Sequence, residues 1–272
     1  MSVHSLDTRP TTIHDLRALK IQGERFVMLT AYDYLSARIL DESGVPVILV
    51  GDSLGMVVLG YENTIPVTVD ELIHHTRAVR RGARRALVVS DMPFMSYQGS
   101  IEDGVRNAGR FLKEAGANGV KLEGAGPTAD LTARLTSIGV PVMGHLGLTP
   151  QSVNQLGGFK VQGRGDAAAE RLIADARELA DAGAFSIVLE CVPAEVSRRI
   201  TEAVHVPTIG IGAGPDTDGQ VMVFHDLLGL TTGRLPRFVK QYADLRGVIS
   251  DAVKAYQAEV ASGDYPGPEH AY

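Results

Sequence analysis

Acidic side chains stand where several short apolar runs of the sequence end. The residues are Asp52, Asp91, Glu123 and Glu190. Like charges gathered in one buried place repel one another, at a cost on the order of several kcal/mol, unless a cation or protons neutralise them. Carboxylate oxygens are the ligands that Mg²⁺ prefers, and the sequence has no His/Cys cluster with zinc-site spacing. Two or three of these carboxylates together predict an oxygen-rich site for Mg²⁺ or a similar hard cation.

A lysine and a histidine accompany these acids. Lys121 lies two residues before Glu123, and successive side chains of a strand point to opposite faces, so the two share one face. If Glu123 points into a charged site, Lys121 does too. His145 ends the next apolar run, where its imidazole is placed to donate a hydrogen bond to a substrate.

Glu190 differs from the other acids because it closes the strongly apolar run FSIVL (185–189). An apolar setting raises the pKa of a carboxyl group, which suits a general base near neutral pH. Its alternative role is that of an ion-pair partner for a basic residue of a neighbouring unit. We favour the base, because the other acids already indicate a site at the same end of the fold. The adjacent Cys191 has no evident base partner and is interpreted as a small, partly buried residue.

Each of the other residues also has a purely structural explanation. An aspartate after a strand, such as Asp52 or Asp91, is commonly a helix cap or turn residue. Lys121 and Glu123 are equally explained by an internal ion pair, and His145 by packing. The coincidence of acidic ends on consecutive strands favours function.

The elements that must position these residues follow a repeated pattern. Amphipathic segments end in a small residue and glycine, and a short apolar strand follows, as in ESGVPVILVGD (42–52) and DAGAFSIVLE (181–190). Strands that are apolar on both faces are typical of a parallel sheet covered by helices. Eight strands are predicted, near residues 25–32, 46–52, 86–91, 118–123, 140–145, 185–190, 206–211 and 223–229.

Eight alternating units predict an α/β fold, a closed (β/α)₈ TIM barrel, with an open doubly wound sheet as the alternative. A short helix near residues 12–20 precedes the first strand, and helices follow the last. We expect residues 1–272 to form this single catalytic barrel domain. The long connections 53–67 and 146–165 follow strands, which places them at the catalytic face of a barrel.

The composition excludes several classes of protein. The chain has 272 residues, which fits one barrel of about 250. Its net charge of −6 argues against nucleic-acid binding, which needs a basic face. No apolar run approaches the ~18 residues of a membrane span, and the polar segment 1–12 predicts no secretory signal. The single cysteine, Cys191, indicates a reducing compartment and a cytoplasmic location.

Long phrases of the sequence resemble the ketopantoate hydroxymethyltransferase family from about Thr11 to His270. The phrases that carry the resemblance are LTAYDY (29–34), VGDSLGMVVLG (50–60), PVTVDELIHHTRAVRRGA (66–83), DMPFMSY (91–97), VKLEG (120–124), GHLGLTPQSVNQLGGFKVQGRG (144–165), LECVP (189–193) and IGIGAGPDTDGQ (209–220). The resemblance implies a barrel of the phosphoenolpyruvate/pyruvate superfamily. It also implies transfer of a one-carbon unit from 5,10-methylenetetrahydrofolate to 3-methyl-2-oxobutanoate, giving 2-dehydropantoate for pantothenate synthesis.

The same resemblance implies roles for individual residues. Mg²⁺ is expected at Asp52 and Asp91, with Glu123 as a ligand or outer partner. The substrate-contacting positions are Asp52, Ser53, Asp91 and Lys121. Glu190 matches the catalytic base. Family members assemble as large homo-oligomers, typically decamers.

Two other functions remain open on the sequence. A carbon–carbon lyase of the isocitrate lyase type would share the metal site, but its cysteine acid stands in a loop with lysine and histidine, unlike Cys191. A catalytically inactive barrel subunit is expected to have lost strand-end charges, whereas Asp52, Asp91, Lys121 and Glu190 are present.

Overall fold

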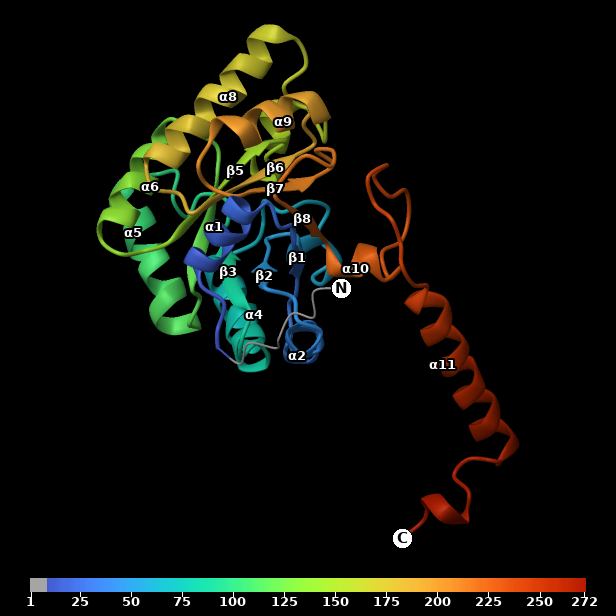
Figure 1. Ribbon diagram of the computed structural model, residues 1–272. Coiled ribbons are helices and arrows are strands. Elements are labelled where there is room, and N and C mark those ends of the chain that lie inside the picture. The colour runs from blue at the N-terminus through green and yellow to red at the C-terminus, as the bar shows by residue number, and fades with distance from the viewer. Residues whose placement is uncertain (1–8) are drawn as a thin grey trace. The chain divides into compact units, whose positions relative to one another are not determined.

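A computed structural model describes residues 9–272, and its central feature is a closed barrel of eight parallel strands in chain order (Figure 1). The strands are β1 (Phe26–Thr30), β2 (Val47–Val50), β3 (Leu87–Asp91), β4 (Gly119–Glu123), β5 (Val142–Gly147), β6 (Ser186–Glu190), β7 (Thr208–Ile211) and β8 (Gly219–Met222). β8 pairs with β1 and closes the barrel. The (β/α)₈ prediction is confirmed, and the open-sheet alternative is wrong. The polar segment 1–12 falls mostly outside the described residues.

Helices surround the barrel on its outside (Figure 1). The longer ones are α1 (Ile13–Gln22), α2 (Tyr34–Glu42), α4 (Val69–Gly82), α5 (Ile101–Arg110), α6 (Pro127–Ser137), α8 (Asp166–Asp181) and α9 (Ala194–Ala203). The connection 53–67 contains the short helix α3 (Leu54–Val57). The connection 146–165 contains a 3₁₀ turn (Pro150–Ser152) and α7 (Val153–Leu156). Both long connections are therefore partly ordered.

The helix starts follow from local hydrogen bonding. Thr68 and Glu71 form a capping box at the start of α4, in which Thr68 Oγ1 accepts from Glu71 N at 3.2 Å. Ser100 caps α5 by accepting from the backbone N–H of Asp103 at 3.1 Å. α8 begins at Asp166, and Gly165 occupies its cap position.

The barrel interior is apolar toward one end and polar toward the other. Buried side chains fill it from alternate strand positions, among them Leu87 and Val89 of β3 and Val188 of β6. Because side chains alternate along a strand, Asp91 continues the inward face of Leu87 and Val89, and Glu190 that of Val188. The apolar half forms one hydrophobic core cluster, and the same faces deliver polar groups to the carboxyl ends of the strands.

The eighth strand was predicted in the wrong place. We expected residues 223–229, but β8 is Gly219–Met222 and the expected segment forms α10 (Phe224–Leu227). The true strand is only weakly apolar. A Cβ at Gly219 would lie 2.8 Å from the ring of Phe26, so the close approach of β1 requires glycine there.

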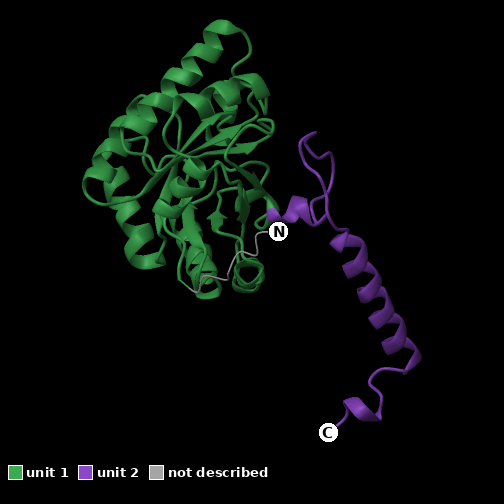
Figure 2. Ribbon diagram, viewed as in Figure 1, with its two compact units in different colours: residues 1–223 green, residues 224–272 purple. Residues whose placement is uncertain are grey.

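The described chain divides into two compact units, residues 1–223 and 224–272 (Figure 2). The first holds the whole barrel. The second contains α10, α11 (Leu245–Ser262) and a 3₁₀ turn (Pro268–His270). Asp244 caps α11 by accepting from the backbone N–H of Gly247 at 3.0 Å. The expectation of a single domain over residues 1–272 stays a prediction. In residues 9–272, no helix combines the length and apolar character that a membrane crossing requires.

Candidate active site

The charged residues predicted from the sequence meet at the carboxyl ends of the strands. The strand register pairs Asp91 with Lys121 and Glu123 with His145. Lys121 Nζ lies 2.8 Å from Asp91 Oδ1, and 4.0 Å from Glu123 Oε1. The backbone N–H of Asp52 donates to Asp91 Oδ2 at 2.9 Å. Side chains of β3, β4 and β5, and of the residues just after β2, thus form one cluster, which we call the carboxylate cluster: Asp52, Asp91, Lys121, Glu123 and His145.

His145 connects this cluster to Glu190. Its Nδ1 lies 3.3 Å from Glu123 Oε1 and 3.2 Å from Lys121 Nζ, and its Nε2 lies 3.4 Å from Glu190 Oε2. The side chain of Glu190 is 18% exposed, whereas that of His145 is 3% exposed. Glu190 is therefore the member of the group that a molecule entering from solvent can reach.

Ser53 stands beside the cluster at the start of α3. Its hydroxyl lies 2.9 Å from the hydroxyl of Tyr32. A Cβ at Gly51 would lie 2.8 Å from Ser53 Oγ and 3.4 Å from Asp91 Oδ2. The glycine before Asp52 therefore allows Ser53 and Asp91 to approach each other.

Two residues of the site escaped the sequence reasoning, Gln151 and Tyr97. Gln151 Nε2 donates to Asp52 Oδ2 at 2.9 Å, and its backbone N–H donates to Glu123 Oε2 at 3.0 Å. The hydroxyl of Tyr97 donates to Gln151 Oε1 at 2.9 Å and accepts from the backbone N–H of Glu123 at 3.0 Å. Neither residue ends a strand, so the pattern of strand ends does not predict them. The unusual length of the connection 146–165, which contains Gln151, is the sequence feature that points to a functional residue there.

Burial and mutual repulsion shift the titration of the cluster. Burial raises the pKa of Asp52 well above its usual range, and the carboxylates of Asp91 and Glu123 add to that shift. Burial works against ionisation of Glu123 too, but His145 and Lys121 outweigh it and lower its pKa. Burial opposes the charge of Lys121, yet the carboxylates around it raise its pKa. The carboxylate cluster thus keeps Lys121 charged and favours the protonated form of Asp52 when no cation is bound.

The donor set fits a hard divalent cation. Two buried carboxylate oxygens, Asp91 Oδ1 and Glu123 Oε1, accept no hydrogen bond. Both lie within ion-pair distance of a basic group, Asp91 Oδ1 of Lys121 and Glu123 Oε1 of His145 and Lys121. Across the described part of the chain, no three His, Cys, Asp or Glu side chains are grouped to enclose an ion. Mg²⁺ commonly binds one or two carboxylates and takes its other ligands from water or substrate, so an open oxygen set suits it.

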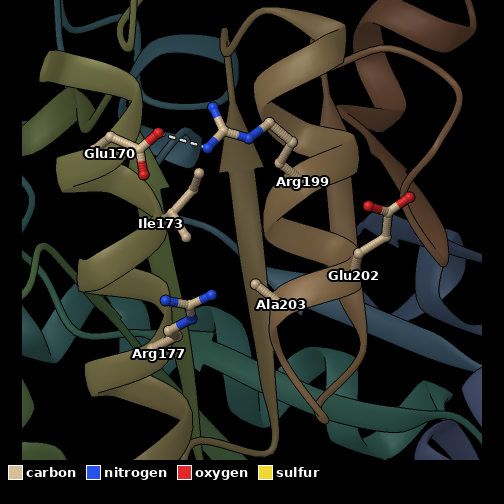
Figure 3. Close-up of a pocket in the computed structure, with 6 residues that line it drawn as sticks. All are labelled: Glu170, Ile173, Arg177, Arg199, Glu202 and Ala203. Atoms are coloured by element: carbon tan, nitrogen blue, oxygen red, sulfur yellow. Dashed lines mark hydrogen bonds and ion pairs between the residues drawn. The ribbon is translucent and has the colours of Figure 1, made fainter. Parts of the chain in front are cut away.

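A surface hollow of about 300 Å³ lies elsewhere, between α8 and α9 (Figure 3). Its charged residues are Glu170 and Arg177 on α8 and Arg199 and Glu202 on α9. Arg199 binds Glu170 at 2.5 Å, and Glu202 accepts from Arg198 at 2.6 Å outside the hollow. Opposite charges balance there, and the hollow is remote from the strand ends, so it is not part of the candidate site.

The titration of His145 predicts how the stability of the metal-free protein depends on pH. Burial and Lys121 oppose a charge on His145, but Glu123 and Glu190 outweigh them and raise its pKa to about 9, from 6.5. A raised histidine pKa stabilises the fold fully below pH 6.5, and that contribution is lost as pH rises through about 9. We expect the free energy of unfolding to fall by roughly 2–3 kcal/mol across that window.

Urea unfolding at several pH values in the presence of a chelator measures this loss. His145→Gln is expected to flatten the slope, and His205→Gln, on an exposed position, to leave it unchanged. An equal slope in wild type and His145→Gln would show that His145 does not cause it.

Comparisons with known proteins agree with this architecture. The family model described as ketopantoate hydroxymethyltransferase matches residues 10–268. The 3-methyl-2-oxobutanoate hydroxymethyltransferase of Syntrophus aciditrophicus (strain SB) is 59% identical over 264 residues, 97% of each chain. The enzyme of the same name from Carboxydothermus hydrogenoformans is 56% identical over 261 residues, 96% of this chain and 95% of its own.

Solved structures of low sequence identity share the fold. Phosphonopyruvate hydrolase superposes with a TM-score of 0.63 at 12% identity, covering 96% of this chain and 91% of its own. For 2,3-dimethylmalate lyase, a member of the PEP mutase/isocitrate lyase superfamily, the TM-score is 0.57 at 16% identity, with 95% and 93% covered. These likenesses show the barrel fold alone. The family model and the curated relatives span nearly the whole chain, and they show that it belongs to the ketopantoate hydroxymethyltransferase family.

Proposed function

We propose that this protein transfers a hydroxymethyl group from 5,10-methylenetetrahydrofolate to 3-methyl-2-oxobutanoate, giving 2-dehydropantoate in pantothenate biosynthesis. Family membership supports the reaction. The structural observation that carries it is the link from the carboxylate cluster through His145 to Glu190 at one end of the barrel. In this arrangement His145 lies between Glu190, a carboxylate that solvent can reach, and Lys121, which is buried and positively charged.

The proposed metal site uses Asp52 and Asp91, with Glu123 as a ligand or outer partner. When bound there, Mg²⁺ would supply Lewis-acid chemistry to a 2-oxo acid. The oxygens of Asp91 and Glu123 that accept no hydrogen bond support this assignment.

The chain's own residues account for the proton transfer. Glu190 takes the proton from C3 of the keto acid, which makes it the general base. Charge then develops on the keto oxygen, and Lys121, buried and cationic, donates to that oxygen and stabilises it. Ser53 and His145 are proposed to bind the substrate by hydrogen bonds. C3 is then the nucleophile that forms a bond to the one-carbon unit; one water molecule supplies the hydroxyl oxygen of the product, and tetrahydrofolate leaves.

The folate supplies that one-carbon unit, and the protein contributes position and electrostatics. The connections 53–67 and 146–165 are proposed to close over the bound substrates and exclude water. Gln151 supports this for the second connection, because it is already 4% exposed and packed onto the cluster. Phe159 and Val161 of the same connection are exposed at 57% and 41%, which leaves apolar surface to cover a ligand.

NMR of the protein with 3-methyl-2-oxobutanoate and Mg²⁺ in D₂O tests the reaction. We expect the C3 proton signal to disappear only when the metal is present. We expect 2-dehydropantoate to form only when methylenetetrahydrofolate is added. Exchange without product would contradict the folate assignment. No exchange by folded, metal-loaded protein would favour the lyase or the inactive barrel subunit. A cytoplasmic location stays a prediction.

We also propose that the chain forms a homo-oligomer, a decamer as the family resemblance implies. None of the residues of α11 is buried. One side of this helix carries an apolar stripe whose side chains are 49–56% exposed: Ile249, Val253, Tyr256 and Val260. Val27 on the outer face of β1 is 49% exposed. Apolar surfaces of this extent commonly mark contacts between chains.

Analytical ultracentrifugation tests the assembly. We expect a particle far larger than the 29.0 kDa chain. Val253→Asp is expected to shift the protein to smaller species, because it places a charge in the apolar stripe. The matched control is Ala258→Asp, on the opposite side of the same helix. A monomeric wild type would refute the oligomer, and equal behaviour of the two variants would exclude the stripe from the contact.

A further inference from the structure

Gln151 occupies an unusual place for an amide side chain. It lies in the 3₁₀ turn Pro150–Ser152 of the connection after β5 and is 4% exposed. Its neighbour on the next turn, Gln155, is exposed to solvent. A buried amide must satisfy its donors and acceptors within the protein, so the contacts of Gln151 define what it does.

All of the polar groups of the Gln151 amide are in use. Nε2 donates to Asp52 Oδ2 and to the carbonyl oxygen of Met92, each at 2.9 Å. Oε1 accepts from the hydroxyl of Tyr97 at 2.9 Å and from Gln98 Nε2 at 3.0 Å. An amide has two N–H donors and two acceptor lone pairs, so none is left for a substrate. Gln151 therefore acts through other residues rather than on the reacting atoms.

The backbone of Gln151 makes a further contact with the carboxylate cluster. The N–H of Gln151 donates to Glu123 Oε2 at 3.0 Å, while Glu123 Oε1 accepts no hydrogen bond. One residue thus holds one oxygen of Asp52 and one oxygen of Glu123. The second oxygen of Glu123 accepts no hydrogen bond and lies 3.3 Å from His145 Nδ1 and 4.0 Å from Lys121 Nζ.

We propose that Gln151 is a positioning residue that couples the order of the connection 146–165 to the affinity of the site for a divalent cation. When this connection packs onto the barrel, Gln151 fixes the two carboxylates in the orientation that a cation needs. Reciprocally, a bound cation holds the connection in place, because coupling between two sites acts equally in both directions. The inference rests on the proposed metal site.

The test uses Mn²⁺ as the probe, with free ion counted by electron paramagnetic resonance and no substrate present. Gln151→Met keeps the length of the side chain and removes its hydrogen bonds. We expect Mn²⁺ affinity to fall about 10–100-fold, the range seen when groups supporting metal ligands are removed. Gln155→Met, the same change on an exposed position of the same connection, is expected to bind Mn²⁺ as the wild type does.

Hydrogen exchange of the backbone amides supplies a second measurement. If Gln151 had only a structural role, Mn²⁺ would not change the exchange rates of this connection. In the wild type, Mn²⁺ is expected to slow exchange in residues 147–158, and in Gln151→Met this protection is lost. The wild-type measurement needs no substitution, so the coupling is tested even if Gln151→Met fails to fold. Protection absent from the wild type, or unchanged Mn²⁺ affinity in Gln151→Met, would overturn the coupling alone. A wild type that binds no Mn²⁺ would overturn the proposed metal site with it.

Discussion

Glu190→Gln is expected to lower the rate of C3 proton exchange in 3-methyl-2-oxobutanoate by about 10²–10⁴-fold, the usual contribution of a general base. The amide keeps the size of the side chain and cannot accept the proton. Glu190 is the member of the charged group that solvent reaches, with its side chain 18% exposed and 3.4 Å from His145 Nε2. Solvent proton exchange followed by NMR in D₂O with Mg²⁺ measures the rate.

Binding must survive for this result to identify a base. Calorimetric titration of Glu190→Gln with the keto acid and Mg²⁺ is expected to match the wild type, because the proposed metal ligands are unchanged. Glu195→Gln, which removes an exposed carboxylate paired with Arg198, is the matched control and should exchange normally. Wild-type exchange by Glu190→Gln would show that another group takes the proton.

Asp91→Asn is expected to weaken metal-dependent binding of the keto acid by on the order of 100-fold or more, beyond the effect typical of groups that only support metal ligands. Asp91 Oδ1 is buried, accepts no hydrogen bond and lies 2.8 Å from Lys121 Nζ. Asparagine retains the shape of the side chain and an oxygen that can accept from the backbone N–H of Asp52. The change therefore removes the charge at nearly constant side-chain volume, and it also takes from Lys121 its nearest carboxylate.

Calorimetric titration with Mg²⁺, and again with a chelator, separates the metal-dependent part of the affinity. Asp103→Asn in α5, at a side chain that is 48% exposed, serves as the control, and its affinity is expected to stay within about twofold of the wild type. Equal metal-dependent affinity in Asp91→Asn and wild type would remove Asp91 from the proposed ligand set.

The sequence determined the barrel and the membership of most of the site. Short apolar runs that stop at a polar residue or glycine predicted seven strands to within a few residues, because a parallel strand buried on both faces must be apolar along its length. The period of two placed Lys121 and Glu123 on one face, and the two meet at one cluster with Asp91. The prediction of the eighth strand was wrong because contact with Phe26 requires glycine at position 219, and a local sequence pattern does not record that contact.

Only the tertiary structure decided how these residues connect. Glu123 and His145 lie 22 positions apart and become neighbours through strand register, and His145 reaches Glu190 because both continue inward faces of adjacent strands. Gln151 joins the cluster through a turn between elements, where no periodicity marks a side chain as buried. Periodic patterns record which side of an element faces the core. Contacts between elements depend on the barrel closing, and this is why the sequence predicted the acids and the structure revealed the amide that holds them.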